Sequence, residues 1–179
     1  EVVESVLKKM NEAERNLGDE EKSVVAEKVA LAAIKYWILR QSIGKDIIFE
    51  KEKALSLEGD SGPYLQYAHT RALSVLRKAK EEGIVVDTTS DLVLGENELS
   101  RKLYRLPEVI EESAKLLAPQ QLVTYLTDLA ATFNNFYAHH QVVVKDDALS
   151  GKRVALVSAF AVVMKNGLAT LGITPPERM

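Results

Sequence analysis

The chain lacks cysteine, and it also lacks the long apolar runs and leader sequences that would direct it to a membrane. With no cysteine among 179 residues, disulfides, thiolate zinc sites and cysteine nucleophiles are excluded. No run approaches the roughly 20 uninterrupted apolar residues of a membrane span, and no charged-then-apolar leader opens the chain. We therefore expect a cytoplasmic protein with no membrane partner.

A strong basic excess is also missing. The formal net charge is −3, and from Gly59 to the C-terminus acidic and basic side chains nearly balance. Non-specific nucleic-acid binders carry a basic surface, so charge alone does not predict an RNA partner. The 46% apolar content is enough for one good core, or for one domain with an appendage, without help from disulfides or metals.

Motifs for metal or nucleotide binding are missing too. His139 and His140 are adjacent, so on a helix they point about 100° apart, and no histidine or carboxylate four residues away completes a site. Ser150-Gly151-Lys152 lacks the glycines and the preceding strand of a phosphate loop. We predict no metal site, no cofactor and no catalytic residue in this chain. Its first residues resemble a helix already in progress, so we expect a piece of a longer protein.

Apolar spacing predicts a mainly α fold. The repeat at three and four residues indicates a bundle of about five helices after a short helical and extended N-terminal part. Predicted helices cover 1–10, 23–38, 63–82, 96–105, 107–117, 119–140 and 147–171, with a loop at 11–20, a short strand or extended segment at 45–50 and a connector at 84–95. The run from Glu58 to Pro63 is rich in glycine, with Asp60 or Ser61 as a helix N-cap, and it fits a domain boundary.

The predicted helix from residue 63 has two distinct faces. Leu65, Ala68, Ala72, Val75, Leu76 and Ala79 fall within one apolar arc, and Tyr64, Tyr67, Arg71, Ser74 and Lys78 fall on a different one. Tyrosine rings can stack on unpaired bases, while arginine and lysine can bind phosphates or base edges. This stripe suits single-stranded RNA, although tyrosines that pack against a neighbouring helix would produce the same spacing.

The predicted helix 119–140 adds weaker candidates. Asn134 and Asn135 lie in mid-helix with side chains able to read bases, but asparagines that simply face solvent would look the same. Tyr137 falls at the margin of the apolar face formed by residues such as Phe133. These positions alone do not decide between an RNA surface and a packed core.

Several ordered blocks resemble one enzyme family. The segment LSLEGDSGPYLQYAHTR at 55–71 closely resembles the sequence with which arginyl-tRNA synthetases enter their anticodon-binding domain. LAATFNNFY at 129–137 and KNGLATLGITPPERM at 165–179 agree with that family in order and spacing. Residues 26–36 and 45–49 resemble the family's segment between its class I catalytic core and that domain, so the resemblance spans nearly the whole chain.

The resemblance implies a function and a set of site residues. A parent enzyme would use ATP and Mg²⁺ to attach arginine to its tRNA, but the phosphate-handling motifs of class I synthetases are absent from this chain, which we expect to be inactive alone. Its role would be to bind the anticodon loop of arginine tRNA. The implied tRNA-binding residues are Tyr64 and Arg71 around the middle anticodon base, Tyr137 stacking nearby, Met179 closing the pocket, and Tyr67, Gln66, Asn134 and Gln141 near the loop without assigned contacts.

The same resemblance implies two parts. Residues 1–58 would be the end of the catalytic body or its linker, and 59–179 a helical bundle of the class I synthetase anticodon-binding type. A helical protein-interaction module without RNA binding is the alternative, with Tyr64, Tyr67 and Tyr137 as interface anchors. The missing motifs argue against a self-contained hydrolase or transferase. The oligomeric state stays open, with a monomer as the expectation.

Overall fold

The structure is a computed structural model that describes residues 1–12, 18–88 and 98–179. Those residues form α-helices joined by turns and loops, and they contain no β-strand. The helices are α1 (Val2–Glu12), α2 (Asp19–Leu39), α3 (Lys51–Ala54), α4 (Gly62–Glu81), α5 (Glu98–Leu103), α6 (Leu106–Lys115), α7 (Pro119–His139) and α8 (Ser150–Thr170). The predicted mainly α fold is confirmed.

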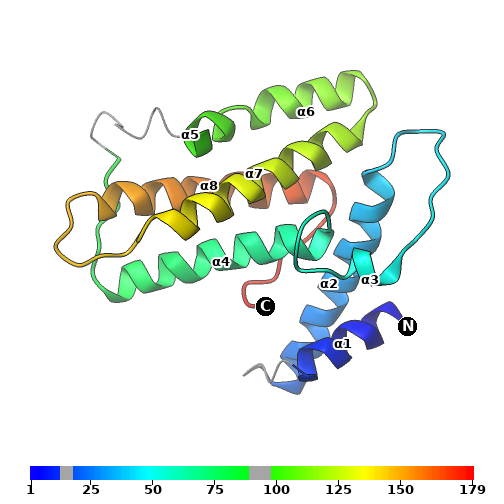
Figure 1. The fold of residues 1–179 in the computed structure, drawn as a ribbon, viewed down its shortest axis with the longest axis horizontal. Coiled ribbons are helices and arrows are strands. Elements are labelled where there is room, and N and C mark those ends of the chain that lie inside the picture. The colour runs from blue at the N-terminus through cyan, green and yellow to red at the C-terminus, as the bar shows by residue number, and fades with distance from the viewer. Residues whose placement is uncertain (13–17, 89–97) are drawn as a thin grey trace.

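A bundle of five helices makes up the larger part of the molecule. Helices α4, α7 and α8 run side by side, while α5 and α6 lie along α7 (Figure 1). The rings of Phe133 and Phe160 stack at the centre, with centroids 3.9 Å apart and an interplanar angle of 8°. A Cβ at Gly167 would lie 2.5 Å from a methyl group of Leu126, so the glycine permits the close approach of α7 and α8.

Helix α8 is apolar on nearly all sides. It is the one helix among the described residues that is long and apolar enough to cross a membrane, judged by length and composition alone. In the bundle its residues pack against α4, α5 and α7, and Val157, Phe160 and Met164 are fully buried. Its neighbours cover only part of it, because 44% of its most apolar stretch is buried and Val162 keeps 55% of its surface exposed. Packing against α4, α5 and α7 therefore accounts for the apolar residues of its buried sides.

A second, smaller apolar cluster lies at the N-terminal end. It joins α1, α2 and α3 with the end of the chain, and it contains Val6, Met10, Val25, Ala26, Val29, Ala30, Ala33, Trp37, Ala54 and Leu55, with Met179 against it. The large cluster takes only Ala32 and Tyr36 from α2 as buried members, with Leu39 against it, and draws its other members from the chain beyond residue 63. The two clusters are compatible with a division near residue 58, which stays a prediction.

Two alternatives were predicted for 45–50, a short strand or an extended segment. The strand is wrong, because the segment contains no β-strand, whereas Glu50 at its end does have an extended backbone. A strand needs a partner for its backbone hydrogen bonds, and the described residues offer none. The segment is held by side chains instead: Trp37 Nε1 donates to the carbonyl of Ile48 at 2.8 Å, and the ring of Phe49 meets the indole edge-on at 5.9 Å.

Parts of three other predictions fall outside the described residues. The predicted loop 11–20 includes 13–17, the connector 84–95 includes 89–95, and the helix 96–105 begins at two residues that the structure does not describe. The described remainder of that helix, α5, is followed after a short turn by α6, which has Pro107 in its first turn as the sequence predicts.

The turn before α4 joins the two clusters. Ser61 is the N-cap of α4, because its side chain accepts a hydrogen bond from the backbone N–H of Tyr64 at 3.1 Å. A Cβ at Gly62 would lie 2.2 Å from the carbonyl oxygen of Ala32, so only glycine lets α4 start this close to α2. The predicted choice between Asp60 and Ser61 as the cap is thus decided for Ser61.

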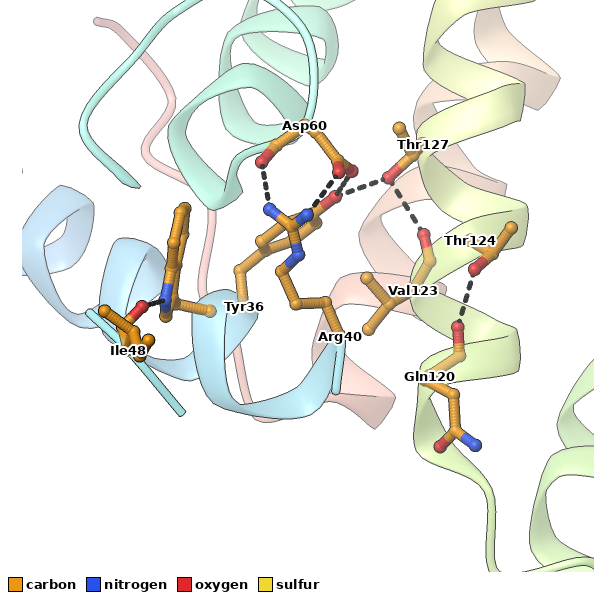
Figure 2. Close-up of polar contacts among 9 residues, drawn as sticks. Tyr36, Arg40, Ile48, Asp60, Gln120, Val123, Thr124 and Thr127 are labelled. Carbon is orange, nitrogen blue, oxygen red and sulfur yellow. Dashed lines mark hydrogen bonds and ion pairs between the residues drawn. The ribbon is translucent and has the colours of Figure 1, made fainter. Parts of the chain in front are cut away.

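Asp60 instead takes part in a polar junction between α2 and α7 (Figure 2). Its carboxylate accepts a hydrogen bond from the hydroxyl of Tyr36 and pairs with Arg40 at 2.8 Å. The same hydroxyl lies 2.9 Å from Thr127 Oγ1 on α7. Burial and the neighbouring Asp60 raise the pKa of Tyr36 above its ordinary value, so the phenol stays protonated and can donate to the carboxylate.

The C-terminal segment returns along α4 (Figure 1). Ile173 is buried in the large cluster. Beyond it, Gln66 donates to the carbonyl of Thr174 at 2.9 Å, and Thr70 donates to the carbonyl of Pro176 at 3.2 Å. These bonds direct the last residues back toward α1 and α2.

Candidate nucleic-acid interface

A polar cluster joins the tyrosine stripe of α4 to α7. Arg71 donates from Nη1 to Asn134 Oδ1 at 2.6 Å and from Nη2 to the hydroxyl of Tyr67 at 3.1 Å. Asn134 donates from Nδ2 to the hydroxyl of Tyr64 at 3.0 Å. We call Tyr64, Tyr67, Arg71 and Asn134 the Arg71 cluster. All four side chains are only partly buried, so they are positioned by one another and still reach the surface.

Aromatic rings flank the arginine. The guanidinium carbon of Arg71 lies 4.7 Å from the ring centroid of Tyr67 and 5.3 Å from that of Tyr137. Tyr137 in turn packs on the buried ring of Phe133, at 6.3 Å and 30°, and keeps 42% of its surface exposed. A cation between two tyrosine rings can stack on bases as well as bind their edges.

The Arg71 cluster lines a hollow of about 450 Å³ together with Leu57, Glu58 and Gly59, from the turn before α4. That volume falls within the range of small-ligand sites. Arg71 bonds an amide and a phenol there and forms no ion pair among the described residues, although the carboxylate of Glu58 lines the same hollow. A hollow with one cation, one carboxylate, two phenol groups and an amide offers the donors, acceptors and ring faces that an unpaired nucleotide can use.

The structure brings together five of the six predicted site residues. Tyr64, Tyr67, Arg71 and Asn134 form the cluster, and Tyr137 adjoins it. Met179 lies elsewhere. It lines a small apolar hollow of about 120 Å³ with Val6, Lys9, Met10, Val29, Leu55 and Leu57. Leu57 lines both hollows, so Met179 lies near the cluster without joining it.

Other predicted candidates have different surroundings. Gln66 is buried and bonds the carbonyls of Lys28 and Thr174, which gives it a structural role in holding the C-terminal segment. Asn135 is exposed and lines a separate hollow with His139 and His140. Sequence reasoning missed Leu57, Glu58 and Gly59, because it treated that turn only as a boundary, and no periodic signal marks such residues.

The described residues contain no group of three or more histidine, aspartate or glutamate side chains close enough to hold a metal ion. What the interface offers is hydrogen bonding, stacking and one cation, which are means of binding.

Most of the chain matches one known protein family. Residues 65–179 match the family model described as the DALR anticodon binding domain, which covers more than half of the chain. The chain belongs to the DALR anticodon-binding domain family. The match begins in α4 one residue after Tyr64, so the DALR domain includes Tyr67, Arg71, Asn134 and Tyr137.

Similarity to individual proteins extends beyond the DALR domain. The whole chain is 40% identical to an arginine–tRNA ligase of Thermococcus kodakarensis and 37% identical to one of Pyrococcus furiosus. It spans only 29% and 30% of the length of these relatives. A solved arginyl-tRNA synthetase of Thermus thermophilus aligns with 99% of the chain, at a TM-score of 0.82 and 32% identity, over 32% of its own length. The predicted resemblance and the fold class are thereby confirmed.

Proposed function

We propose that this chain binds the anticodon loop of arginine tRNA through the Arg71 cluster, as the C-terminal part of an arginine–tRNA ligase. The observation that carries the proposal is the hollow in which Tyr64 converges with Tyr67, Arg71 and Asn134, the last three of which belong to the DALR domain. Anticodon-loop bases are unpaired, so they can leave the stack and enter a hollow of this kind.

The chemistry of each side chain suggests its role. Arg71 supplies guanidinium N–H groups for a base edge or a phosphate, and Asn134 holds that guanidinium at 2.6 Å. The rings of Tyr67 and Tyr137 lie within 5.3 Å of the guanidinium carbon and offer faces for stacking. Because these groups are already oriented, little ordering remains to be done when a base arrives.

The proposal includes the parent protein. The similar full-length proteins are named arginine–tRNA ligases, and this chain corresponds to about 30% of their length. We propose that the rest of such a ligase attaches arginine to tRNA with ATP and Mg²⁺. Residues 1–58 would join that catalytic part to the bundle of 59–179. We also propose that the protein is cytoplasmic and monomeric. The chain itself would contribute binding and orientation of the tRNA.

Met179 remains part of the proposal, although it lines a neighbouring hollow and does not close the pocket itself. It lines the small apolar hollow together with Leu57, which also lines the hollow of the Arg71 cluster. Met179 would therefore support the rim of the site through Leu57. Deletion of Met179 should weaken tRNA binding modestly, and an unchanged affinity would remove the C-terminus from the site.

The test is a titration with an arginine tRNA transcript and with a second transcript whose middle anticodon base is changed. A base that stacks and pairs its polar edge contributes about 1–3 kcal/mol, so the changed transcript should bind roughly tenfold more weakly. Affinity should also fall as salt rises, by about 0.7 logarithmic units per tenfold increase for each phosphate contacted.

Variants at two arginines of α4 sharpen the result. Arg71→Ala should lose about tenfold in affinity, because it removes the cation and leaves Asn134 Oδ1 unpaired. Arg77→Ala is the matched control, since Arg77 is exposed and bonds only Ser74 and the carbonyl of Glu177 among the described residues. Equal affinities of the two variants would contradict the assigned site. Binding of a protein partner with little salt dependence, and of no tRNA, would favour the interaction-module alternative.

A further inference from the structure

The sulfur chemistry of the chain is confined to three methionines, because the chain has no cysteine. The three differ in exposure. Met164 is fully buried in the large cluster, and Met10 keeps 8% of its surface exposed. Met179 is only partly buried, and it packs against the smaller cluster from the end of the chain. A dissolved oxidant therefore reaches the sulfur of Met179 most readily.

The surroundings of Met179 suit a thioether and not a polar group. Met179 lines the small apolar hollow of about 120 Å³, whose other lining residues come from α1, α2 and the segment after α3. A hollow of this volume has room for one further oxygen atom on the sulfur, so oxidation needs no unfolding of the chain. Apart from Lys9, the lining side chains are apolar, and an oxygen left among them without a hydrogen bond is unfavourable.

Lys9 supplies a hydrogen-bond donor at the rim of this hollow. Its ammonium lies 3.5 Å from the carboxylate of Glu52, and 48% of the Lys9 side chain is exposed, so the charged end faces the solvent side of the hollow. An ammonium group has three donors, and a single ion pair does not use them all. A sulfoxide oxygen at the rim could therefore bond Lys9, whereas one inside the hollow could not.

The last two residues depend on packing for their position. Thr70 donates to the carbonyl of Pro176 at 3.2 Å, and Arg77 donates to the carbonyl of Glu177 at 3.5 Å. For Met179 the described residues provide no hydrogen bond or ion pair, and its contact with the smaller cluster is apolar. A change that makes this one side chain polar removes what holds the end of the chain.

We propose that Met179 is a site of reversible oxidation, at which hydrogen peroxide converts the thioether to a sulfoxide and releases the end of the chain from the small hollow. The sulfur loses two electrons, and the peroxide gains them. The O–O bond breaks, one oxygen bonds to sulfur, and the other leaves as water with both hydrogens. The sulfoxide is polar, so its oxygen moves out to Lys9 and to solvent.

The release affects RNA binding through Leu57. This residue lines both the small hollow and the hollow of the Arg71 cluster. When Met179 leaves, the hollow that both residues line opens, and Leu57 is less firmly held at the rim of the Arg71 cluster. This part of the inference rests on the proposed function and adds regulation to it: oxidation weakens RNA binding, and reductases that act on methionine sulfoxide restore it.

The first measurement maps the oxidation. The chain is exposed to hydrogen peroxide for increasing times, and mass spectrometry of its peptides gives the fraction of sulfoxide at each methionine. Met179 should be oxidised first, Met10 more slowly, and Met164 only when urea unfolds the chain. Equal rates for the three residues in the folded chain, or protection of Met179, would overturn the proposal.

The second measurement follows the consequences of oxidation. Trp37 is the only tryptophan and belongs to the smaller cluster, so its fluorescence reports on the packing that Met179 completes. At the exposure that oxidises Met179 alone, the urea midpoint of this fluorescence should fall. The affinity for an arginine tRNA transcript should fall roughly threefold to tenfold. Methionine sulfoxide reductase should restore both, and complete oxidation of Met179 with either one unchanged would contradict the proposal.

Two matched variants identify the residue responsible. In Met179→Leu, whatever its own affinity and midpoint, the same peroxide treatment should change neither. In Met10→Leu the treatment should produce the losses seen in the wild type, because Met179 is still present. Losses of that size in Met179→Leu would assign the effect to another residue and refute the site. If the untreated chain binds no transcript, the proposed function is wrong, and the peptide map and the fluorescence still decide whether Met179 is the oxidation site.

Discussion

At the scale of single residues, Asn134 explains how the candidate site is held together. Its side-chain amide uses both ends, accepting from Arg71 and donating to Tyr64. Hydrogen bonds to a charged group are worth about 1.5–3 kcal/mol, so the bond to Arg71 restrains a long side chain that would otherwise sample many rotamers. The helical repeat predicted that Tyr64 and Arg71 share a face, but it left Asn134 with two readings, because its neighbour lies on another helix.

The burial of His69 should make the stability of the fold depend on pH. Its side chain is 4% exposed, and burial together with the nearby charge of Lys165 lowers its pKa from 6.5 to about 4. Between these values the unfolded chain binds a proton that the folded chain does not, so the free energy of unfolding should rise with pH in this window. Urea unfolding should show about 2 kcal/mol less stability at pH 5 than at pH 7.

The histidine variants give this prediction its control. In His69→Gln the free energy of unfolding should change much less between pH 5 and pH 7, because the titrating group is removed. This holds whatever the effect of the substitution on stability at neutral pH. His139→Gln should retain the wild-type dependence, since His139 is exposed. An unaltered dependence in His69→Gln would show that other groups cause it.

At the scale of helices, the entry into α4 combines a local signal with a tertiary one. The Ser61 cap and Pro63 in the first turn are preferences of the backbone itself, and both are recognisable in the sequence. Gly62 is different. Its φ angle is not in the left-handed region, and the residue is required because α2 lies against it. No local pattern distinguishes such a glycine from one in an ordinary turn.

Gly62→Ala should therefore be severely destabilising. The new Cβ would lie 2.2 Å from the carbonyl oxygen of Ala32, and backbone cannot yield as a side chain does. Overpacking of this kind costs typically 1–3 kcal/mol, and we expect the upper part of that range, with a thermal midpoint lower by roughly 5 °C or more. Gly18→Ala is the control, because none of the described residues lies within 4 Å of a Cβ there. Similar midpoints for the two variants would refute the explanation for Gly62.

At the scale of the whole molecule, two apolar clusters are joined through α2. Tyr36 faces the larger cluster, whereas Trp37, the next residue, belongs to the smaller one. Trp37 is the only tryptophan in the chain, so its fluorescence reports on the smaller cluster, while far-UV circular dichroism reports on all the helices. The Tyr36–Asp60–Thr127 contacts shown in Figure 2 connect the two parts.

Tyr36→Phe should loosen that connection. It removes a hydroxyl that bonds both Asp60 and Thr127, at a cost of about 1–3 kcal/mol. In urea, the wild-type transitions by fluorescence and circular dichroism should coincide, and in the variant the fluorescence transition should come first. Tyr104→Phe is the control, because Tyr104 is 80% exposed. Coincident transitions in Tyr36→Phe would mean that the chain unfolds as one unit without this junction.

The sequence by itself determined the helices other than α3, their apolar faces and the stripe of Tyr64, Tyr67 and Arg71, and its resemblance to arginyl-tRNA synthetases agrees with the family match. These features depend on spacing within one helix, which the 3.6-residue repeat makes visible. Only the tertiary structure decided that Asn134 binds Arg71, that Gln66 holds the C-terminal segment, that Met179 packs against α1 and α2, and that 45–50 pairs with no strand. These outcomes depend on which surfaces meet across helices, and that is set by packing between residues far apart in the chain.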